Sequence, residues 1–237
     1  MFRELKKIKR QDGCRDANEF LRNVFDSVCK LNNKMGLKLT EYEQDGGNYP
    51  YAVDHPLMYG ERGLYSLFAA SLIKNSEATI SELSHKRKPA TKRKDQNARV
   101  VFWSRYNGRD YIIELKRQAI SPSYDYSNSR REKWEALKKQ IDEAKRYDED
   151  TNYLGILVLY LYSSSKCKKK LNKEYSIGEI RKDICNKSNF RPDYLGAWEP
   201  KEEWKIYATW GDGDKLLRYE KNHGVLFLTY SRLVGND

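Results

Sequence analysis

The fold is decided by the stretch Tyr111–Arg117, which has the sequence YIIELKR. Successive side chains of a strand point to opposite faces, so Glu114 and Lys116 would share one face with Ile112. The apolar neighbours indicate burial, and a buried charge is costly unless it is paired or bound to a metal. The stretch therefore predicts a mostly buried strand with charged groups on one face.

A second β-like run, Ala98–Tyr106, precedes this stretch, and Asn107-Gly108 lies between the two. Asn-Gly flanked by such runs is the strongest short-range signal for a β-hairpin. A regular hairpin closed by this turn pairs residues whose numbers sum to 215, which sets Glu114 opposite Val101.

The rest of the chain predicts an α/β protein. Tyr153–Tyr162 is almost continuously apolar, as in a strand that is buried on both faces. A hairpin, a helix and such a strand in succession imply a crossover connection. The expected helices are Asp16 to near Gly36, Gly60 to Lys74, about 130–147, and Ile177 to Cys185; the expected later strands are Trp204–Trp210 and Val225–Tyr230; residues 41–59 are expected as a loop.

We expect one domain, 1–237, with a core at about 60–162, a helical lead-in at 1–59 and a β-rich C-terminal extension at 163–237. The chain is long enough to bury a substantial core. No apolar run is long enough for a membrane helix, and the four cysteines form no zinc-binding pattern with the three histidines. A cytoplasmic protein with reduced thiols is expected.

The formal charge of +11 points to a polyanionic partner, with nucleic acid first and an acidic membrane surface second. A soluble protein that is merely rich in lysine is the simpler alternative. Two segments concentrate the charge, residues 85–94 and 163–173. They are expected to be either solvated loops or loops that contact phosphates, through Lys86, Arg87, Lys88, Lys92, Arg93, Lys94, Lys168, Lys169 and Lys170.

Two predicted helices carry further candidates. Glu61 lies one turn before Leu64, on the apolar stripe of its helix, where it could face a site or simply complement the helix dipole. Gln140 and Tyr147 flank the apolar stripe of the helix at 130–147, which consists of Trp134, Leu137, Ile141 and Ala144.

This order of elements resembles the PD-(D/E)XK nuclease superfamily, which has the restriction endonuclease-like fold, over residues 60–162. The resemblance implies that Glu114 is the metal-binding acid of the E-x-K motif and Lys116 its lysine. It also implies that Glu61 is the helix-borne acid and Gln140 the glutamine of the following helix. Tyr147 would accompany Gln140, at a wider spacing than in RecB-type members.

The superfamily also has an acid on the strand before E-x-K, and Val100–Phe102 supplies none. Asp95 is the favoured substitute, although a straight hairpin would place it far from Glu114. Asp110 is the alternative, but four strand residues separate it from Glu114, roughly 13 Å. A second match to the motif, Pro192-Asp193 with Glu203-Trp204-Lys205, lacks the preceding apolar run.

Hydrolysis of a phosphodiester with a metal needs these residue types. Mg²⁺ prefers oxygen ligands, and Mn²⁺ can replace it. A lysine beside the carboxylates can orient water and offset charge in the transition state. A Glu–Lys pair on an exposed sheet face, contributing at most about 1 kcal/mol, is the structural alternative.

The sequence thus predicts a Mg²⁺-dependent DNA endonuclease, acting as a homodimer or with a partner protein. One alternative is a catalytically inactive module of the same scaffold that binds DNA within a larger DNA-processing or defence complex. Another is an adaptor whose basic loops meet an acidic protein.

Overall fold

The computed structural model describes residues 1–9, 14–44, 56–57, 60–86, 97–120, 127–144, 151–165, 177–179, 181–182, 191–200, 206–211 and 215–234. Its elements are β1 Phe2–Lys6, α1 Cys14–Gln44, α2 Gly60–Asn75, β2 Ala78–Lys86, β3 Asn97–Tyr106, β4 Arg109–Ile120, α3 Ser127–Glu143, β5 Thr151–Ser165, β6 Tyr194–Trp198, β7 Ile206–Gly211 and β8 Lys215–Arg232.

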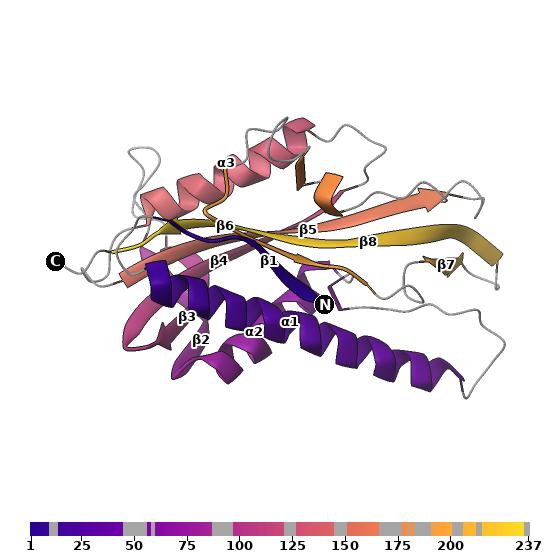
Figure 1. Cartoon of the computed structure of the whole chain (residues 1–237), viewed down its shortest axis with the longest axis horizontal. Coiled ribbons are helices and arrows are strands. Elements are labelled where there is room, and N and C mark those ends of the chain that lie inside the picture. Colours follow the sequence, from indigo (N-terminus) through magenta and orange to yellow (C-terminus); the bar gives the residue numbers. More distant parts are fainter. Residues whose placement is uncertain are drawn as a thin grey trace.

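The strands described form one mixed sheet in the order β1-β6-β8-β5-β4-β3-β2, with β7 paired to β8. β4 and β5 are parallel, as the crossover through α3 requires, and the other pairs are antiparallel. In Figure 1, α3 lies on one side of the sheet and α1 and α2 lie on the other. The predicted α/β class is confirmed.

The predicted hairpin is confirmed with its register. β3 and β4 pair from Tyr106↔Arg109 to Phe102↔Ile113, and each pair sums to 215. Asn107 has φ 49° and Gly108 has φ 71°, so both turn residues adopt the left-handed conformation that a type I′ turn needs.

Both faces of β4 are buried, and each face packs against different helices. Tyr111, Ile113 and Leu115 belong to the core formed with α1 and α2. Ile112 packs in a cluster with Ile141 of α3, on the opposite face. As predicted, Trp134, Leu137 and Ile141 of α3 are buried, together with Ala144, which directly follows the helix.

β5 is the central strand, and its residues from Thr151 to Leu161 are buried. A Cβ atom on Gly155 would lie 2.9 Å from both Ile141 Cγ1 and Leu137 Cγ. The absence of a side chain at Gly155 therefore allows α3 to lie directly on the sheet.

Several predicted boundaries were wrong. α1 continues through Gly36 to Gln44, because one glycine costs a helix only about 1 kcal/mol and helix-forming residues follow it. The lead-in contains the short strand β1, which pairs with β6. His85 and Lys86, expected at the start of a loop, end the strand β2.

The segment expected as a C-terminal extension contributes to the middle of the sheet. β8 pairs with β5 from Tyr153↔Arg232 to Ser165↔Tyr219, and β6 pairs with the other side of β8. β8 begins at Lys215, ten residues before the expected strand at Val225. None of the helices in the described ranges is long and apolar enough to cross a membrane.

Candidate active site at the strand fork

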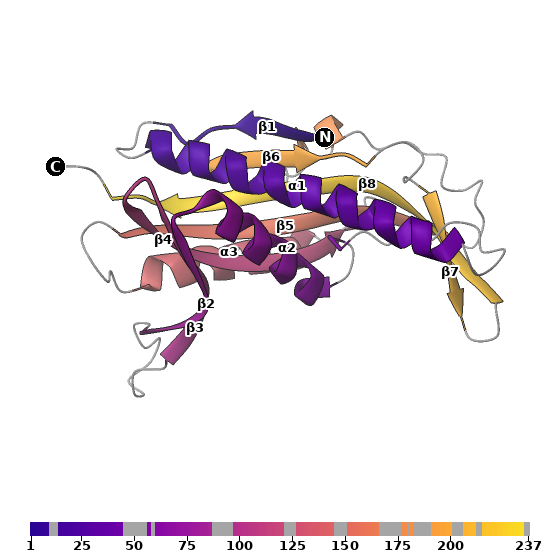
Figure 2. The same cartoon turned by 90° about the horizontal axis from the view of Figure 1, so that it is seen from below.

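β3 separates from β4 directly before Glu114. The described pairs between the two strands end at Phe102↔Ile113, whereas β2 stays paired with β3 as far as Lys86↔Asn97. Figure 2 shows β2 and β3 running together away from the other strands. We call the segment of β4 beyond this separation, residues 114–118, the fork.

Side chains replace the missing strand along the open edge of the fork. The hydroxyl of Tyr65 in α2 donates a long hydrogen bond of 3.5 Å to the carbonyl of Leu115. The ammonium of Lys133 in α3 donates to the carbonyl of Arg117 at 3.1 Å. Backbone carbonyls without a neighbouring strand need other hydrogen-bond donors, and here the donors come from both helices that flank the sheet. The fork is therefore the place where α2, β4 and α3 meet.

Glu114 and Lys116 form an ion pair at the fork. The Nζ atom of Lys116 lies 2.7 Å from Oε1 of Glu114, and the exposed fractions of the two side chains are 32% and 6%. The carboxylate is thus buried, while the ammonium reaches solvent. Removing charges from water costs free energy that a pair only partly offsets, so such a pair is weak evidence for stability. The structure does not support the alternative of a pair on an exposed sheet face.

Helix geometry indicates that Gln140 lies over the fork on the α3 side. It follows Lys133 by seven residues, which is two turns or about 10.5 Å along the same side of the helix. Lys133 contacts Arg117, and Glu114 precedes Arg117 by three strand residues, or about 10 Å. Because α3 runs antiparallel to β4, two helical turns after Lys133 lead from Arg117 back to the level of Glu114. The Oε1 atom of Gln140 is buried and has no hydrogen-bond partner among the described residues.

The position of α3 over the fork is fixed from its other flank. The hydroxyl of Tyr230 in β8 donates to Oδ1 of Asp142 at 2.9 Å. The guanidinium of Arg232 donates to the carbonyls of Asp142 and Ala144, each at 2.9 Å. These bonds, with the close contact at Gly155, hold the helix in one register.

Glu61 lies in the first turn of α2, four residues before Tyr65. Since the Tyr65 hydroxyl contacts the fork, α2 begins next to it. α2 packs on the face opposite Glu114, and the Glu61 side chain lies outside the described atoms.

Two alternative acids are engaged elsewhere in the fold. Asp110 accepts hydrogen bonds from Arg105 at 2.7 and 3.1 Å. Asp193, the acid of the second motif match, accepts from the backbone N–H and the hydroxyl of Ser231 at 2.8 and 3.0 Å. Both have structural partners and neither lies at the fork.

The remaining candidates lie outside the described residues. These are Asp95, Tyr147, Glu203, Lys205 and most of the basic loop residues, namely Arg87, Lys88, Lys92, Arg93, Lys94, Lys168, Lys169 and Lys170. Of Lys86 only the backbone is described, at the end of β2 opposite Asn97.

Sequence reasoning did not identify Tyr65 or Lys133. Their bonds go to backbone carbonyls of β4, fifty and sixteen residues away, and no residue pattern reveals such a partner. The only available signal was their helical spacing, since Tyr65 is one turn from Glu61 and Lys133 two turns from Gln140.

The residues at the fork fit a hard divalent cation in part. The buried Glu114 carboxylate and the Gln140 amide oxygen are the oxygen donors that Mg²⁺ accepts. Within the described ranges, no three side chains of His, Cys, Asp and Glu are grouped to hold a metal. Glu61 and Asp95, neither of whose side chains is described, would have to complete the set.

Comparison of the chain with protein-family models, with curated protein sequences and with solved structures gives no match in any of the three.

Proposed function

We propose that this protein is a Mg²⁺-dependent DNA endonuclease of the restriction endonuclease-like fold, with its active site at the fork. The observation that carries the proposal is the buried Glu114 paired at 2.7 Å with Lys116, at the point where β3 leaves β4. The order α2, β2, β3, β4, α3, β5 supports it, because the superfamily resemblance implies a helix, a hairpin ending in E-x-K, a helix and a strand.

Two residues of the fork and three residues from elsewhere in the chain have roles in this proposal. Glu114, with Glu61 and Asp95, would hold the ion, which when bound polarises the phosphoryl group and lowers the pKa of water. Lys116, whose ammonium reaches solvent, would orient the attacking water and offset the charge that develops on the phosphate. The Gln140 amide would position the water or a metal ligand through its unpartnered oxygen.

The charge of the whole chain supports a nucleic acid substrate. An excess of eleven positive charges attracts the phosphate backbone without regard to sequence. Binding through such charges weakens steeply as salt rises. An adaptor for an acidic protein partner would instead retain no DNA at moderate salt.

The test is nicking of supercoiled plasmid with Mg²⁺, with Mn²⁺ and with chelator. Wild type is compared with Glu114→Gln and Lys116→Met, and with the control pair Glu135→Gln and Lys138→Met. The control removes the same two charges from an ion pair within α3, where Lys138 Nζ lies 2.9 Å from Glu135 Oε2.

Nicking that requires metal, that is lost in both fork variants and that persists in the control pair would support the proposal. Metal-dependent nicking that survives Glu114→Gln would refute it.

A second candidate is a DNA-binding module of the same scaffold without catalysis. This candidate is favoured because Glu114 is the single carboxylate at the fork among the described side chains. Well-folded wild type that shifts DNA in a salt-dependent manner but does not nick it would select this candidate.

A further inference from the structure

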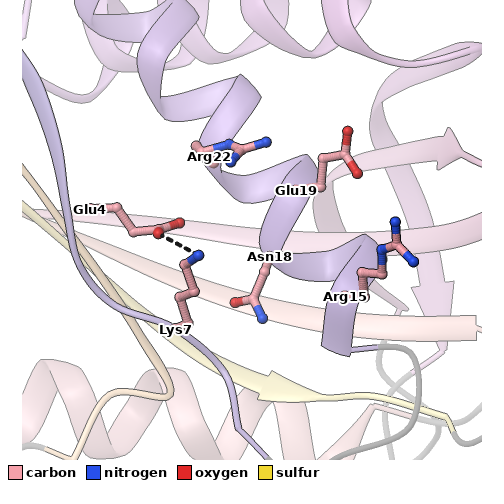
Figure 3. A pocket seen from close by; sticks show the side chains of 6 residues that line it. All are labelled: Glu4, Lys7, Arg15, Asn18, Glu19 and Arg22. Carbon is pink, nitrogen blue, oxygen red and sulfur yellow. Dashed lines mark ion pairs between the residues drawn. The ribbon is translucent and has the colours of Figure 1, made fainter.

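A pocket lies between the end of β1 and the first turns of α1, away from the fork. Its volume is about 390 Å³, and it is lined by Glu4, Lys7, Arg15, Asn18, Glu19 and Arg22 (Figure 3). α1 covers the face of the sheet opposite α3, and β1 is the strand at the far edge from β2. The pocket is therefore separate from Glu114 and Lys116.

The wall of the pocket is held in place by internal hydrogen bonds. The Asn18 side chain accepts from the N–H of Ile8 at 2.8 Å and donates to its carbonyl at 3.0 Å. These two bonds join the chain after β1 to the first turn of α1. The spacing between the two walls is thus set before any ligand binds.

Both acids of the pocket already have partners. Glu4 pairs with Lys7 at 3.2 Å and accepts a hydrogen bond of 3.0 Å from the hydroxyl of Tyr194. Burial raises the pKa of Tyr106, and the neighbouring Glu19 carboxylate adds to this shift. Neither carboxylate needs an arginine to be satisfied.

Unlike the two acids of the pocket, its two arginines have no ion-pair or hydrogen-bond partner among the described residues. Arg15 and Arg22 are seven residues apart, so they project from the same side of α1. In the part of the chain that the structure describes, neither forms an ion pair or a hydrogen bond. Figure 3 shows both on the stretch of α1 beside the Glu4–Lys7 pair. The pocket thus presents two guanidinium groups that form no ion pair with its two carboxylates, Glu4 and Glu19.

We propose that this pocket binds a dianionic phosphate, either inorganic phosphate or a phosphomonoester. Guanidinium groups bind phosphate oxygens through paired N–H donors, and two arginines can engage the three terminal oxygens of a monoester, which carries nearly two negative charges at neutral pH. A phosphodiester has only two terminal oxygens and one charge, so it offers the two arginines fewer acceptors. The ligand is free phosphate, a phosphorylated small molecule or the phosphorylated end of a nucleic acid.

Calorimetric titration with inorganic phosphate tests the site on the full chain. Wild type is compared with Arg15→Gln, Arg22→Gln and the control Lys30→Gln, which removes a cation from α1 where it pairs with Asp26. We expect one saturable site, weakened about tenfold or more by either arginine variant and unchanged by the control. Binding should strengthen as pH rises through about 6, where a phosphomonoester loses its second proton.

Absence of saturable binding would overturn the proposal, as would equal affinity in wild type and both arginine variants. An equal loss in Lys30→Gln would also overturn it, since net charge alone would then explain binding. Glu114→Gln should leave phosphate binding intact. The experiment therefore distinguishes a wrong proposal for the phosphate pocket from a wrong proposal for the active site at the fork.

A pair of short duplexes, with a 5′-phosphate and with a 5′-hydroxyl, identifies the source of the phosphate. Tighter binding of the phosphorylated duplex by wild type, lost in Arg15→Gln and Arg22→Gln, supports the pocket as a reader of DNA ends. Equal binding of the two duplexes, with saturable binding of inorganic phosphate, supports the pocket as a site for a small phosphate.

Discussion

Replacing Glu114 and Lys116 together should leave the protein as stable as before, while replacing Lys116 alone should not. Glu114 is 5% exposed, so Lys116→Met removes a 2.7 Å ion pair from a buried carboxylate. For a fully buried pair this costs about 3–5 kcal/mol. Lys116 is one-third exposed and water reaches the pair, so we expect about 2–3 kcal/mol for Lys116→Met.

The double variant Glu114→Leu with Lys116→Met removes both charges and the cost of burying them. Apolar replacement of a buried ion pair is neutral or stabilising by about 1–4 kcal/mol. In a chain of this size 1 kcal/mol shifts the melting temperature by about 2–4 °C, so Lys116→Met should melt about 4–12 °C below wild type. The double variant should melt at or above the wild-type temperature.

Urea denaturation and thermal melting of the three proteins, wild type, Lys116→Met and the double variant, measure these differences, and plasmid nicking is recorded on the same samples. A stable double variant without nicking would show that the pair is retained for chemistry. A double variant that is destabilised as much as Lys116→Met would refute the reasoning, because the pair would then be holding the fold together.

Three further outcomes follow from the packing. Gly155→Ala should destabilise by about 1–3 kcal/mol in urea denaturation, because the added methyl meets two α3 side chains at 2.9 Å; unchanged stability would show that α3 does not lie directly on β5. Burial raises the pKa of the Cys29 thiol, so this residue should resist a thiol reagent at pH 8 until the protein unfolds, as peptide mapping would show; labelling at the rate of a free thiol would contradict its burial. Burial, with the hydrogen bond to Asp142, raises the pKa of Tyr230 to about 12. Its contribution to stability should be complete below the unfolded pKa of about 10 and be lost as pH rises toward about 12, and Tyr230→Phe should flatten this decline in alkaline melting curves. An equally steep decline in the variant would assign the loss to other groups.

The elements predicted correctly are those whose signals are local. Asn107-Gly108 determines both the turn and the register of the hairpin, because only residues that tolerate positive φ fit a type I′ turn. The apolar run of β5 and the apolar stripe of α3 are each recognisable from the spacing of apolar residues within the segment itself. The crossover between them follows from the short connection and the parallel pairing that it permits.

The elements that were missed depend on distant partners. β1 is five residues long and strongly polar, and it is a strand because β6 pairs with it nearly two hundred residues later. β6 lies between β1 and β8, and no feature of its own sequence indicates that it occupies this place in the sheet. Such strands are formed by tertiary context rather than by propensity.

The candidate site also has one part that the sequence predicts and one part that depends on distant partners. Glu114 and Lys116 were identified from alternation within one strand, and the structure brings them together. The fork itself could not be predicted, because the side chains that contact its open edge, Tyr65 and Lys133, come from two separate helices.

The central claim, that the fork holds a catalytic metal, is tested most directly by an anomalous diffraction measurement on crystals soaked in Mn²⁺. We expect a peak about 2.0–2.2 Å from a carboxylate oxygen of Glu114, and its loss in crystals of Glu114→Gln. A peak of equal height in the variant, or saturating Mn²⁺ with no peak at the fork, would contradict the claim.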